Sequence, residues 1–588
     1  MARLRSAAVA AVLLAVTVPG RALAGWAEPD PRPLNADPNR SAGNPHMGIY
    51  GDPLVVWEEA AGGWHEIRAS LFQERKAWTR STTPVSTAKR DARDPTVAYW
   101  LADSWVAWRE SNLSVYQVRA RTWYPNCDCG GPISPPLNVD PTAEARAPYI
   151  AFVTKVPFVA WQETGAGGAQ QIWVRSWNGS AWVMAGSNSL NVHAATDAVD
   201  PAVADVNGVA YVAWREDAPG PRGDQIHVKA FEAGSWVDVG GTSLNVDPSR
   251  SAGKPSVISV RGTPYVAWTE SNGTAEQVHV KRFEGGQWRS VGGSLNVDPA
   301  RSAADPTVRN VRGDPMVAWG ESDGTMNRIR AKILRDGSWR SVGGPLNSAP
   351  GADPVLANAR GAPYVAWVRT DSPTEIRVKR LDPDILASSA RPSARSAVLS
   401  AQVDDFNVRL PIGLELSTRT AAFGTYASNA HRRISPGTGV STVSRTFDDL
   451  RPGTRYFFRA FSSEYGGFPE TSIGATGQFT TVGRPRITDL SVAPRSFAAG
   501  RDRPGAVVSF TSSEGATTTF VVQKWKDGAY VKAGAVTRHH GAGVNHFNFR
   551  GRLRGRTLAP GLYRFKAVAR NDAGKSRRPV FAAFRITG

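Results

Sequence analysis

The chain has 588 residues, of which 41% are hydrophobic and 21% are charged, with a formal net charge of +19 and only two cysteines. This length is too great for one hydrophobic core, so we expect several domains. No apolar run after residue 24 is long enough for a membrane-spanning helix, and two cysteines without a histidine cluster cannot complete a structural zinc site. The composition therefore excludes a helical membrane protein and a cysteine-based zinc protein.

The N-terminal segment has the pattern of an export signal. Two arginines precede an apolar run over residues 7–18, and the small residues of Ala22-Leu23-Ala24 follow. A charged start, an apolar run too short to span a bilayer and an Ala-x-Ala site are typical of a signal that is removed after export. We therefore predict a signal peptide over residues 1–24 and a mature protein that is secreted, with retention at the cell surface as a further expectation.

An internal repeat occupies the next 350 or so residues. A Val-Val-Trp or Val-Ala-Trp tripeptide recurs at spacings between 48 and 54 residues, ending at Trp57, Trp108, Trp161, Trp214, Trp268, Trp319 and Trp367. Each period contains four short runs of β-forming residues, bounded by Gly, Pro, Asp or Asn. Four strands in about fifty residues are the pattern of a propeller blade. We predict an all-β chain that begins with a seven-bladed β-propeller over residues 25–382.

The fourth strand of the blades carries a second tryptophan, and its absence from the last period predicts how the ring closes. We assign this strand by Trp78, Trp123, Trp182, Trp236, Trp288 and Trp339. The seventh period ends near Leu381 without such a strand. Trp26, followed by Pro33-Leu34-Asn35, parallels Trp339, followed by Pro345-Leu346-Asn347. The N-terminal segment should therefore supply the outer strand of the last blade.

Glycine pairs also recur in the repeat, at Gly240-Gly241, Gly292-Gly293 and Gly343-Gly344. Together with the period and the four short strands, these pairs resemble the bacterial kelch-like propellers over residues 25–382. The pair lies in a different strand context from the kelch repeat, so the resemblance implies the architecture and only a loose kinship.

Two further modules follow the repeat. Residues 388–482 resemble a fibronectin type III domain, because the stretch from Leu450 to Ala460 alternates like a strand and gives Tyr456 the context of a tyrosine corner. Residues 484–588 resemble a bacterial immunoglobulin-like domain. The first resemblance implies a β-sandwich that serves as a spacer or adhesion module, and the second implies a further β-sandwich.

The positive charge belongs to the last module. Residues 25–383 hold 37 basic and 38 acidic side chains, whereas residues 483–588 hold 20 and 5. Assigned to one strand, four alternating arginines would form a charged row: Arg550, Arg552, Arg554 and Arg556. Outside the cell such a field favours an anionic envelope polymer over nucleic acid. The alternative is that arginine is simply frequent in this proteome.

Two short features interrupt or mark the repeat. Cys127 and Cys129 flank one residue, and an exported pair this close favours a disulfide that holds a turn, although a redox role stays open. Departures from the repeat are candidate binding positions, and they comprise His193, Arg222 and Arg369.

A ring of glutamates follows the repeat tryptophans by two residues, and paired carboxylates are one way to build a catalytic site. Its members are Glu59, Glu110, Glu163, Glu216, Glu270 and Glu321. Glycoside hydrolysis needs two carboxyl groups in different environments, whereas equivalent repeat positions supply equal ones. We therefore interpret these side chains as turn caps and inter-blade hydrogen-bond acceptors, and we assign no catalytic residue, cofactor or metal.

The sequence favours a monomeric, non-catalytic binding or adhesion protein. A loop face of the propeller would bind a glycan or a protein, and the basic module would associate with the anionic envelope. The alternative is a secreted polysaccharide hydrolase or lyase with a propeller catalytic domain.

Overall fold

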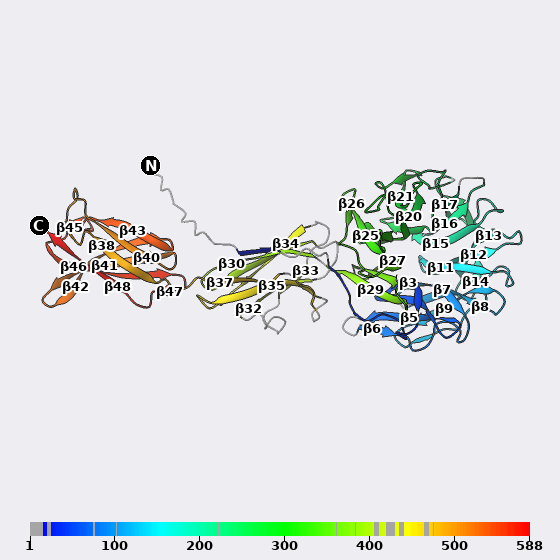
Figure 1. Ribbon diagram of the computed structural model, residues 1–588, viewed down its shortest axis with the longest axis horizontal. Helices are drawn as coiled ribbons and strands as arrows, with labels where there is room; N and C mark the ends of the chain where they lie inside the picture. The colour runs from blue at the N-terminus through cyan, green and yellow to red at the C-terminus, as the bar shows by residue number, and fades with distance from the viewer. Residues whose placement is uncertain are drawn as a thin grey trace.

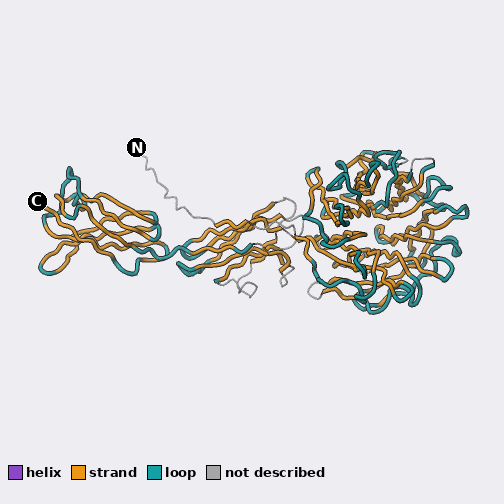
Figure 2. Tube along the Cα trace, in the orientation of Figure 1, coloured by secondary structure: helices purple, strands orange, loops and turns teal. Residues whose placement is uncertain are grey.

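The computed structural model of the chain describes residues 16–19, 25–73, 77–101, 103–219, 223–241, 243–359, 361–382, 384–404, 411–418, 430–433, 440–463, 470–473 and 475–588. Every regular element in these ranges is a β-strand and none is a helix (Figures 1 and 2). No helix long and apolar enough to cross a membrane occurs among them. The described chain is all-β, as predicted.

Seven four-stranded antiparallel sheets form the repeat region, which we define as residues 25–382. Sheets 1 to 3 contain β3 (Ala42–Tyr50), β4 (Asp52–Ala60), β5 (His65–Gln73), β6 (Ala77–Arg80); β7 (Ala92–Trp100), β8 (Asp103–Ser111), β9 (Tyr116–Tyr124), β10 (Cys129–Gly130); β11 (Ala145–Val153), β12 (Val156–Thr164), β13 (Gln170–Trp177), β14 (Trp182–Met184). Sheets 4 and 5 contain β15 (Ala198–Val206), β16 (Val209–Asp217), β17 (Asp224–Glu232), β18 (Ser235–Asp238); β19 (Ser256–Val260), β20 (Thr263–Ser271), β21 (Glu276–Glu284), β22 (Gln287–Ser290). Sheets 6 and 7 contain β23 (Ala303–Val311), β24 (Asp314–Ser322), β25 (Asn327–Arg335), β26 (Ser338–Ser341); β27 (Gly351–Ala359), β28 (Ala362–Arg369), β29 (Glu375–Asp382), β2 (Gly25–Ala27).

The two ends of the repeat region meet in sheet 7. Strand β2 pairs antiparallel with β29, so that Trp26 lies opposite Leu381. The Trp26 indole N–H donates to the Val342 carbonyl of sheet 6 at 2.8 Å. In the same way Trp236, Trp288 and Trp339 donate to a carbonyl of the preceding sheet, at 2.6–2.7 Å. The N-terminal strand therefore occupies the place of the missing fourth strand, and repeated sheets closed in this way are consistent with a β-propeller.

The tryptophans of the second strands form the core between the sheets. Their side chains are fully buried, with at most 3% exposed, at Trp57, Trp108, Trp161, Trp214, Trp268, Trp319 and Trp367. The expectation that they are core residues is confirmed. Truncating one of these side chains to alanine should cost about 3–5 kcal/mol of unfolding free energy.

Sheet 2 departs from the assignment made from the sequence. Trp123 lies in the third strand, β9, opposite Gly130, and not in the fourth. The equivalent third-strand positions hold Phe72 and Phe231, which lie opposite Trp78 and Trp236. The prediction that Trp123 marks a fourth strand is therefore wrong. In sheet 2 the tryptophan belongs to the third strand, and the fourth strand, β10, has only two residues.

The recurrent glycine pairs have a steric cause. Gly240 has a φ of +73°, and a Cβ there would meet the ring atoms of Phe283 at 2.5 Å and Trp288 at 2.9 Å. The first glycine thus lets the loop turn left-handed directly against the aromatic side chains of the next sheet.

Two separate hydrophobic cores follow the repeat region. The first belongs to what we call the middle module, with β30 (Asp384–Pro392), β31 (Ala397–Asp404), β34 (Val440–Phe447) on one sheet and β32 (Pro411–Ser417), β33 (Ala430–Arg433), β35 (Arg455–Ser463), β36 (Glu470–Ile473), β37 (Gly477–Thr480) on another. Strand β1 (Val16–Pro19) lies within the predicted signal peptide and pairs with β30. Figure 1 shows this module beside the repeat region.

The second core belongs to the C-terminal module, residues 484–588. One sheet contains β38 (Ile487–Ala493), β40 (Ala506–Ser512) and β43 (Gly543–Phe549). Another contains β39 (Ser496–Ala498), β48 (Val580–Thr587), β46 (Gly561–Asn571), β41 (Ala516–Lys526), β42 (Ala529–His540) and β47 (Gly574–Lys575). A small hairpin joins β44 (Arg552–Leu553) to β45 (Arg556–Thr557).

A buried tyrosine ties a turn in each of these modules. The Tyr456 hydroxyl accepts the Arg451 backbone N–H at 2.9 Å. The Tyr563 hydroxyl donates to the Ala559 carbonyl at 2.7 Å. A tyrosine that bonds to the backbone a few residues upstream is the geometry of a tyrosine corner.

Candidate functional site

All seven sheets of the repeat region line one pocket of about 270 Å³. Each sheet contributes a dipeptide that ends in a buried proline, at or just before its first strand. These dipeptides are Asn44-Pro45, Asp94-Pro95, Ala147-Pro148, Asp200-Pro201, Lys254-Pro255, Asp305-Pro306 and Asp353-Pro354. Because the first strand of every sheet takes part, the pocket lies where the seven sheets converge. We call it the axial pocket.

A β-bulge shapes the wall of the pocket in six of the seven sheets. In sheet 2, for example, the register with β8 shifts between Arg93 and Thr96. Proline has no N–H to donate to the ladder, and the residue before it has a φ between +45° and +55° at Asn44, Asp94, Ala147, Asp200, Asp305 and Asp353. Such bulges re-aim side chains away from the pleat of the sheet. The sheets thereby present their pre-proline side chains to the pocket.

The four aspartates of the pocket fall into two pairs. Asp94 and Asp200 each accept an arginine at 2.7 Å, from Arg109 and Arg215 respectively. Both arginines directly follow a second-strand tryptophan. In sheets 6 and 7 the same positions hold Gly320 and Val368. Asp305 and Asp353 therefore lack the arginine that neutralises their counterparts.

Lys254 stands at the pre-proline position of sheet 5, where most sheets carry an acid. Its side chain is open to water from within the pocket. Burial lowers the pKa of Lys254, but the charges of Asp200, Asp305 and Asp353 outweigh burial and leave the pKa raised. Burial and the charge of Asp305 raise the pKa of Asp353 to about 6, against the opposing effect of Lys254. One side of the pocket thus holds a lysine among three aspartates, of which Asp353 has a raised pKa.

Another part of the pocket is aromatic and cationic. The His46 ring lies edge-on to Tyr149 with ring centres 5.3 Å apart, and its Nδ1 accepts the Val97 N–H at 3.1 Å. Arg309 donates to the Tyr149 hydroxyl at 3.2 Å. Burial, together with the positive charges of Arg309 and Lys254, lowers the pKa of His46 to about 3. The imidazole is therefore neutral at physiological pH.

The pocket can both accept and donate hydrogen bonds. In the described part of the chain, no three His, Cys, Asp or Glu side chains are grouped to hold one. Two carboxylates without arginine partners can accept hydrogen bonds from hydroxyl or amino groups, while Lys254 and Arg309 can donate.

The glutamate ring is structural. Glu216, for example, accepts the indole N–H of Trp214 at 2.8 Å and the backbone N–H groups of Val192 and His193 at 2.9 and 2.6 Å. Glu59, Glu163, Glu270 and Glu321 repeat this set of three partners. Each carboxylate ties the loop before a sheet to that sheet, which confirms the interpretation as hydrogen-bond acceptors.

The other repeat-breaking candidates lie away from the axial pocket. Arg369 pairs with Asp371 and Glu375, each at 3.1 Å, so acids of its own sheet engage it. His193 has an exposed side chain in the loop before sheet 4. Arg222 lies outside the described residues.

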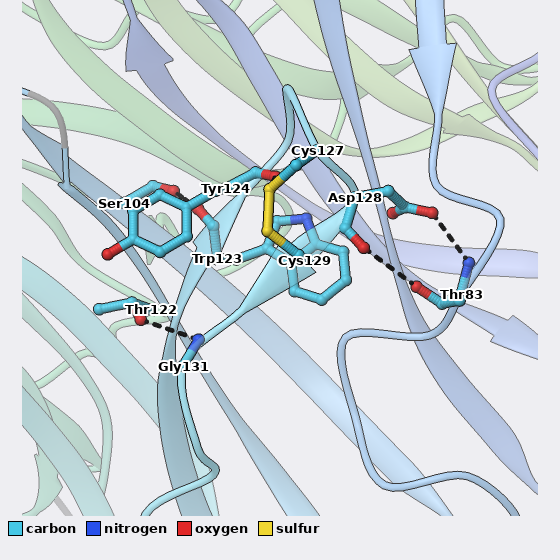
Figure 3. The surroundings of a disulfide bond; sticks show 9 residues. All are labelled: Thr83, Ser104, Thr122, Trp123, Tyr124, Cys127, Asp128, Cys129 and Gly131. Carbon is cyan, nitrogen blue, oxygen red and sulfur yellow. Dashed lines mark hydrogen bonds between the residues drawn. A yellow bond between two sulfur atoms is a disulfide. The ribbon is translucent and has the colours of Figure 1, made fainter.

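Cys127 and Cys129 form a disulfide in the turn between β9 and β10 (Figure 3). The residue between them, Asp128, accepts the Thr82 hydroxyl and backbone N–H at 2.7 Å and the Thr83 N–H at 3.1 Å. These threonines belong to the loop after sheet 1. Sheet 2 lacks the fourth-strand tryptophan, and the disulfide turn supplies a substitute clamp onto the preceding sheet.

The four arginines expected to form a row do not share a strand. Arg552 and Arg556 lie in the two arms of a hairpin, and Arg554, with a φ of +47°, lies in its turn. Arg550 donates to the Arg501 carbonyl at 3.1 Å before the hairpin begins. The predicted single-strand arrangement is wrong, because Gly551 and Gly555 both adopt positive φ and turn the chain.

The axial pocket was missed by the sequence analysis. Its signal was the proline at one position of every period, preceded by an acid in four of them. The expectation that equivalent repeat positions have equal environments also fails here, since Asp94 pairs with Arg109 and Asp305 has no arginine partner among the described residues.

No protein-family model matches the chain, and no curated protein matches it. Among solved structures, the polysaccharide lyase Uly1 is 8% identical with a TM-score of 0.41, covering 62% of this chain and 98% of that chain. The Hadza microbial sialidase Hz136 is 13% identical with a TM-score of 0.35, covering 54% and 74%. A mutant of AofleA from Arthrobotrys oligospora is 12% identical with a TM-score of 0.33, covering 55% and 88%. These likenesses are too distant to assign an activity.

Proposed function

We propose that the chain is a secreted or cell-surface binding protein without catalytic activity. In this proposal residues 25–382 form a seven-bladed, loosely kelch-like propeller that holds the end of a glycan in the axial pocket. A fibronectin type III domain over residues 388–482 acts as a spacer. An immunoglobulin-like domain over residues 484–588 associates with the anionic envelope. Protein ligands are the other class that the loop face would accommodate.

One observation carries the glycan assignment: Asp305 and Asp353 lie in an open pocket without the arginines that neutralise their counterparts. Carboxylates accept hydrogen bonds from vicinal hydroxyl groups, and such bonds to charged groups contribute about 1.5–3 kcal/mol each. The ring of prolines and Tyr149 offer apolar surface to the faces of a sugar ring. A volume of about 270 Å³ lies just below the usual range of small-molecule pockets, roughly 300–1,000 Å³. The pocket therefore suits a terminal sugar unit.

Binding to a glycan array tests the proposal, with Asp305→Asn and Asp353→Asn as pocket variants. Losing a charged acceptor should weaken binding of the selected glycan by about tenfold or more. Asp336→Asn is the matched control, because Asp336 is an exposed aspartate in the turn between β25 and β26. Equal binding by all three variants, or no glycan bound by the unmodified protein, would remove the axial pocket from the function.

A polysaccharide hydrolase or lyase is the second candidate. The observation in its favour is the pKa of Asp353, raised to about 6 beside Asp305, since acid–base catalysis requires two carboxyl groups in unequal states. An assay of reducing-sugar release, run on the glycans that the array selects, separates the two candidates. Turnover that Asp353→Asn abolishes while binding persists would favour the enzyme.

A further inference from the structure

A second concave site lies between the middle and C-terminal modules. This cleft, of about 1,000 Å³, is lined by residues of both modules. Its five arginines are Arg395, Arg484, Arg486, Arg577 and Arg578. Arg395 comes from the turn between β30 and β31, two others precede β38, and the last pair precedes β48. Residues nearly two hundred positions apart in the chain thus meet around one hollow, which we call the arginine cleft.

The arginine cleft contains no compensating acid. None of its lining residues is Asp or Glu. All five arginines are exposed, and in the described part of the chain none of them has an acidic partner within 4.0 Å. Glu514, which does not line the cleft, accepts the Gly483 N–H at 3.3 Å.

The segment beneath the cleft is attached to both modules. The Val482 N–H donates to the Ser393 carbonyl of the middle module at 3.0 Å. Asn571 of the C-terminal module donates to the Gly483 carbonyl at 2.9 Å. The Arg486 backbone bonds to Ser513 through both its N–H and its carbonyl, at 2.9 and 3.0 Å. Holding the linker in this way positions the arginines before a ligand arrives, which lowers the entropy cost of binding.

The chemistry of the cleft matches a tetrahedral oxyanion. A guanidinium presents five N–H donors in a planar fork and bonds phosphate or sulfate oxygens in pairs. Five such groups around one hollow recognise several anionic groups in succession. A polymer chain can enter a hollow between two modules, whereas a flat bilayer surface would contact only the rim of the hollow.

We propose that the arginine cleft binds a linear extracellular polymer that carries phosphodiester or sulfate groups. The inference refines the envelope association of the proposed function by giving it a site. It places that site at the junction of the two modules and not at the hairpin that carries Arg552 and Arg556.

The test measures binding of the full chain to two labelled probes, heparin as a sulfated polysaccharide and poly(glycerol phosphate) as a phosphodiester polymer. The cleft variant combines Arg484→Gln, Arg577→Gln and Arg578→Gln. The control removes the same charge from the same module at exposed positions away from the cleft, by Lys532→Gln, Arg554→Gln and Arg556→Gln. Thermal unfolding of both variants should match the unmodified chain, because the substituted side chains are exposed.

The cleft variant should bind its preferred probe about tenfold or more weakly, while the control stays within about twofold. Each phosphate contact contributes roughly 0.7–0.9 to the slope of log affinity against log salt, so the slope should fall by about two in the cleft variant. The probe that binds more tightly identifies phosphate or sulfate as the natural group.

Four results would overturn the inference. Equal losses of affinity in the cleft variant and the control would show that only total charge matters. Unchanged affinity of the cleft variant would show that the chain associates with the envelope polymer through another site. Tighter binding to phosphatidylglycerol vesicles than to either polymer would replace the polymer by a membrane. Absence of binding to either probe at low salt would remove both the cleft and the envelope association, whereas the glycan array tests the axial pocket independently.

Discussion

The repeat region and the C-terminal module handle charge in opposite ways. The repeat region has nearly equal numbers of basic and acidic side chains, and its arginines commonly pair with acids, as Arg109, Arg215 and Arg369 do at 2.7–3.1 Å. The C-terminal module has 20 basic and 5 acidic residues, and most of its arginines are exposed. Charge in the repeat region connects neighbouring strands and sheets, whereas charge in the C-terminal module is available to a ligand.

Each region also departs from uniformity at one place. In the repeat region, Asp305 and Asp353 lack the arginine that equivalent positions have. In the C-terminal module, the arginines concentrate at the junction with the middle module. The candidate site of the repeat region thus lies where charge compensation is missing, and that of the C-terminal module lies where arginines from several segments line one cleft.

Deleting residues 25–33 should cause the largest loss of stability in the repeat region. The deletion removes β2, leaves the fourth-strand place of sheet 7 empty and exposes an unpaired strand edge, which promotes aggregation. Calorimetry should show the transition of the repeat region at a much lower temperature and light scattering should rise, while transitions of the other modules stay in place. A repeat-region transition at its original temperature would contradict closure by β2.

Replacing one glutamate of the ring should cause the second-largest loss of stability. Glu216→Ala leaves three buried or part-buried donors without their carboxylate acceptor, and we expect a loss of about 3 kcal/mol of unfolding free energy. Glu232→Ala is the control, because Glu232 is exposed at the end of β17. Denaturant unfolding followed by tryptophan fluorescence measures both, and equal midpoints would show that the ring carries little of the stability.

The axial pocket should make stability depend on pH. Folding raises the pKa of Asp353 from 3.8 to about 6, so its contribution is fully present below pH 4 and is lost as pH rises through 6. The loss is up to about 2 kcal/mol, since one pKa unit corresponds to about 1.4 kcal/mol and water in the pocket screens part of it. Asp353→Asn should therefore gain stability relative to the unmodified chain between pH 4 and 7. Parallel stability curves for the two proteins would contradict the raised pKa.

Removing the disulfide should have the smallest effect on the free energy of unfolding. A loop closed by Cys127 and Cys129 removes little entropy from the unfolded chain, so replacing both by serine should cost less than about 1 kcal/mol. Asp128→Ala should cost more, about 1–2 kcal/mol, because the donors of Thr82 and Thr83 lose their acceptor. Thermal unfolding of the two variants ranks them, and the reverse order would assign the clamp to the covalent bond.

Much of the fold follows from local patterns. The spacing of the tryptophans, the alternation within strands and the turn glycines predict repeated four-stranded sheets, and the position of Trp26 predicts the strand that completes the last one. The prediction was wrong where it assigned a strand from the residue type alone: Trp123 is a tryptophan, as in the fourth strands, but it lies in a third strand. It failed again where glycines turned a chain that an alternating pattern had made a strand, as between Arg550 and Arg556.

The sequence by itself determined the repeat, its core tryptophans and the location of the net charge, because periodicity and composition are local properties. Only the tertiary structure decided which charged side chains pair with a side chain of opposite charge. Asp94 and Asp305 begin the same tetrapeptide, Asp-Pro-Thr-Val, yet one meets Arg109 and the other faces Gly320. The partner comes from the next strand, across a bulge that shifts the register. Similarly, Arg395 and Arg577 line one cleft only because two modules lie end to end, and such an arrangement depends on the fold of distant segments.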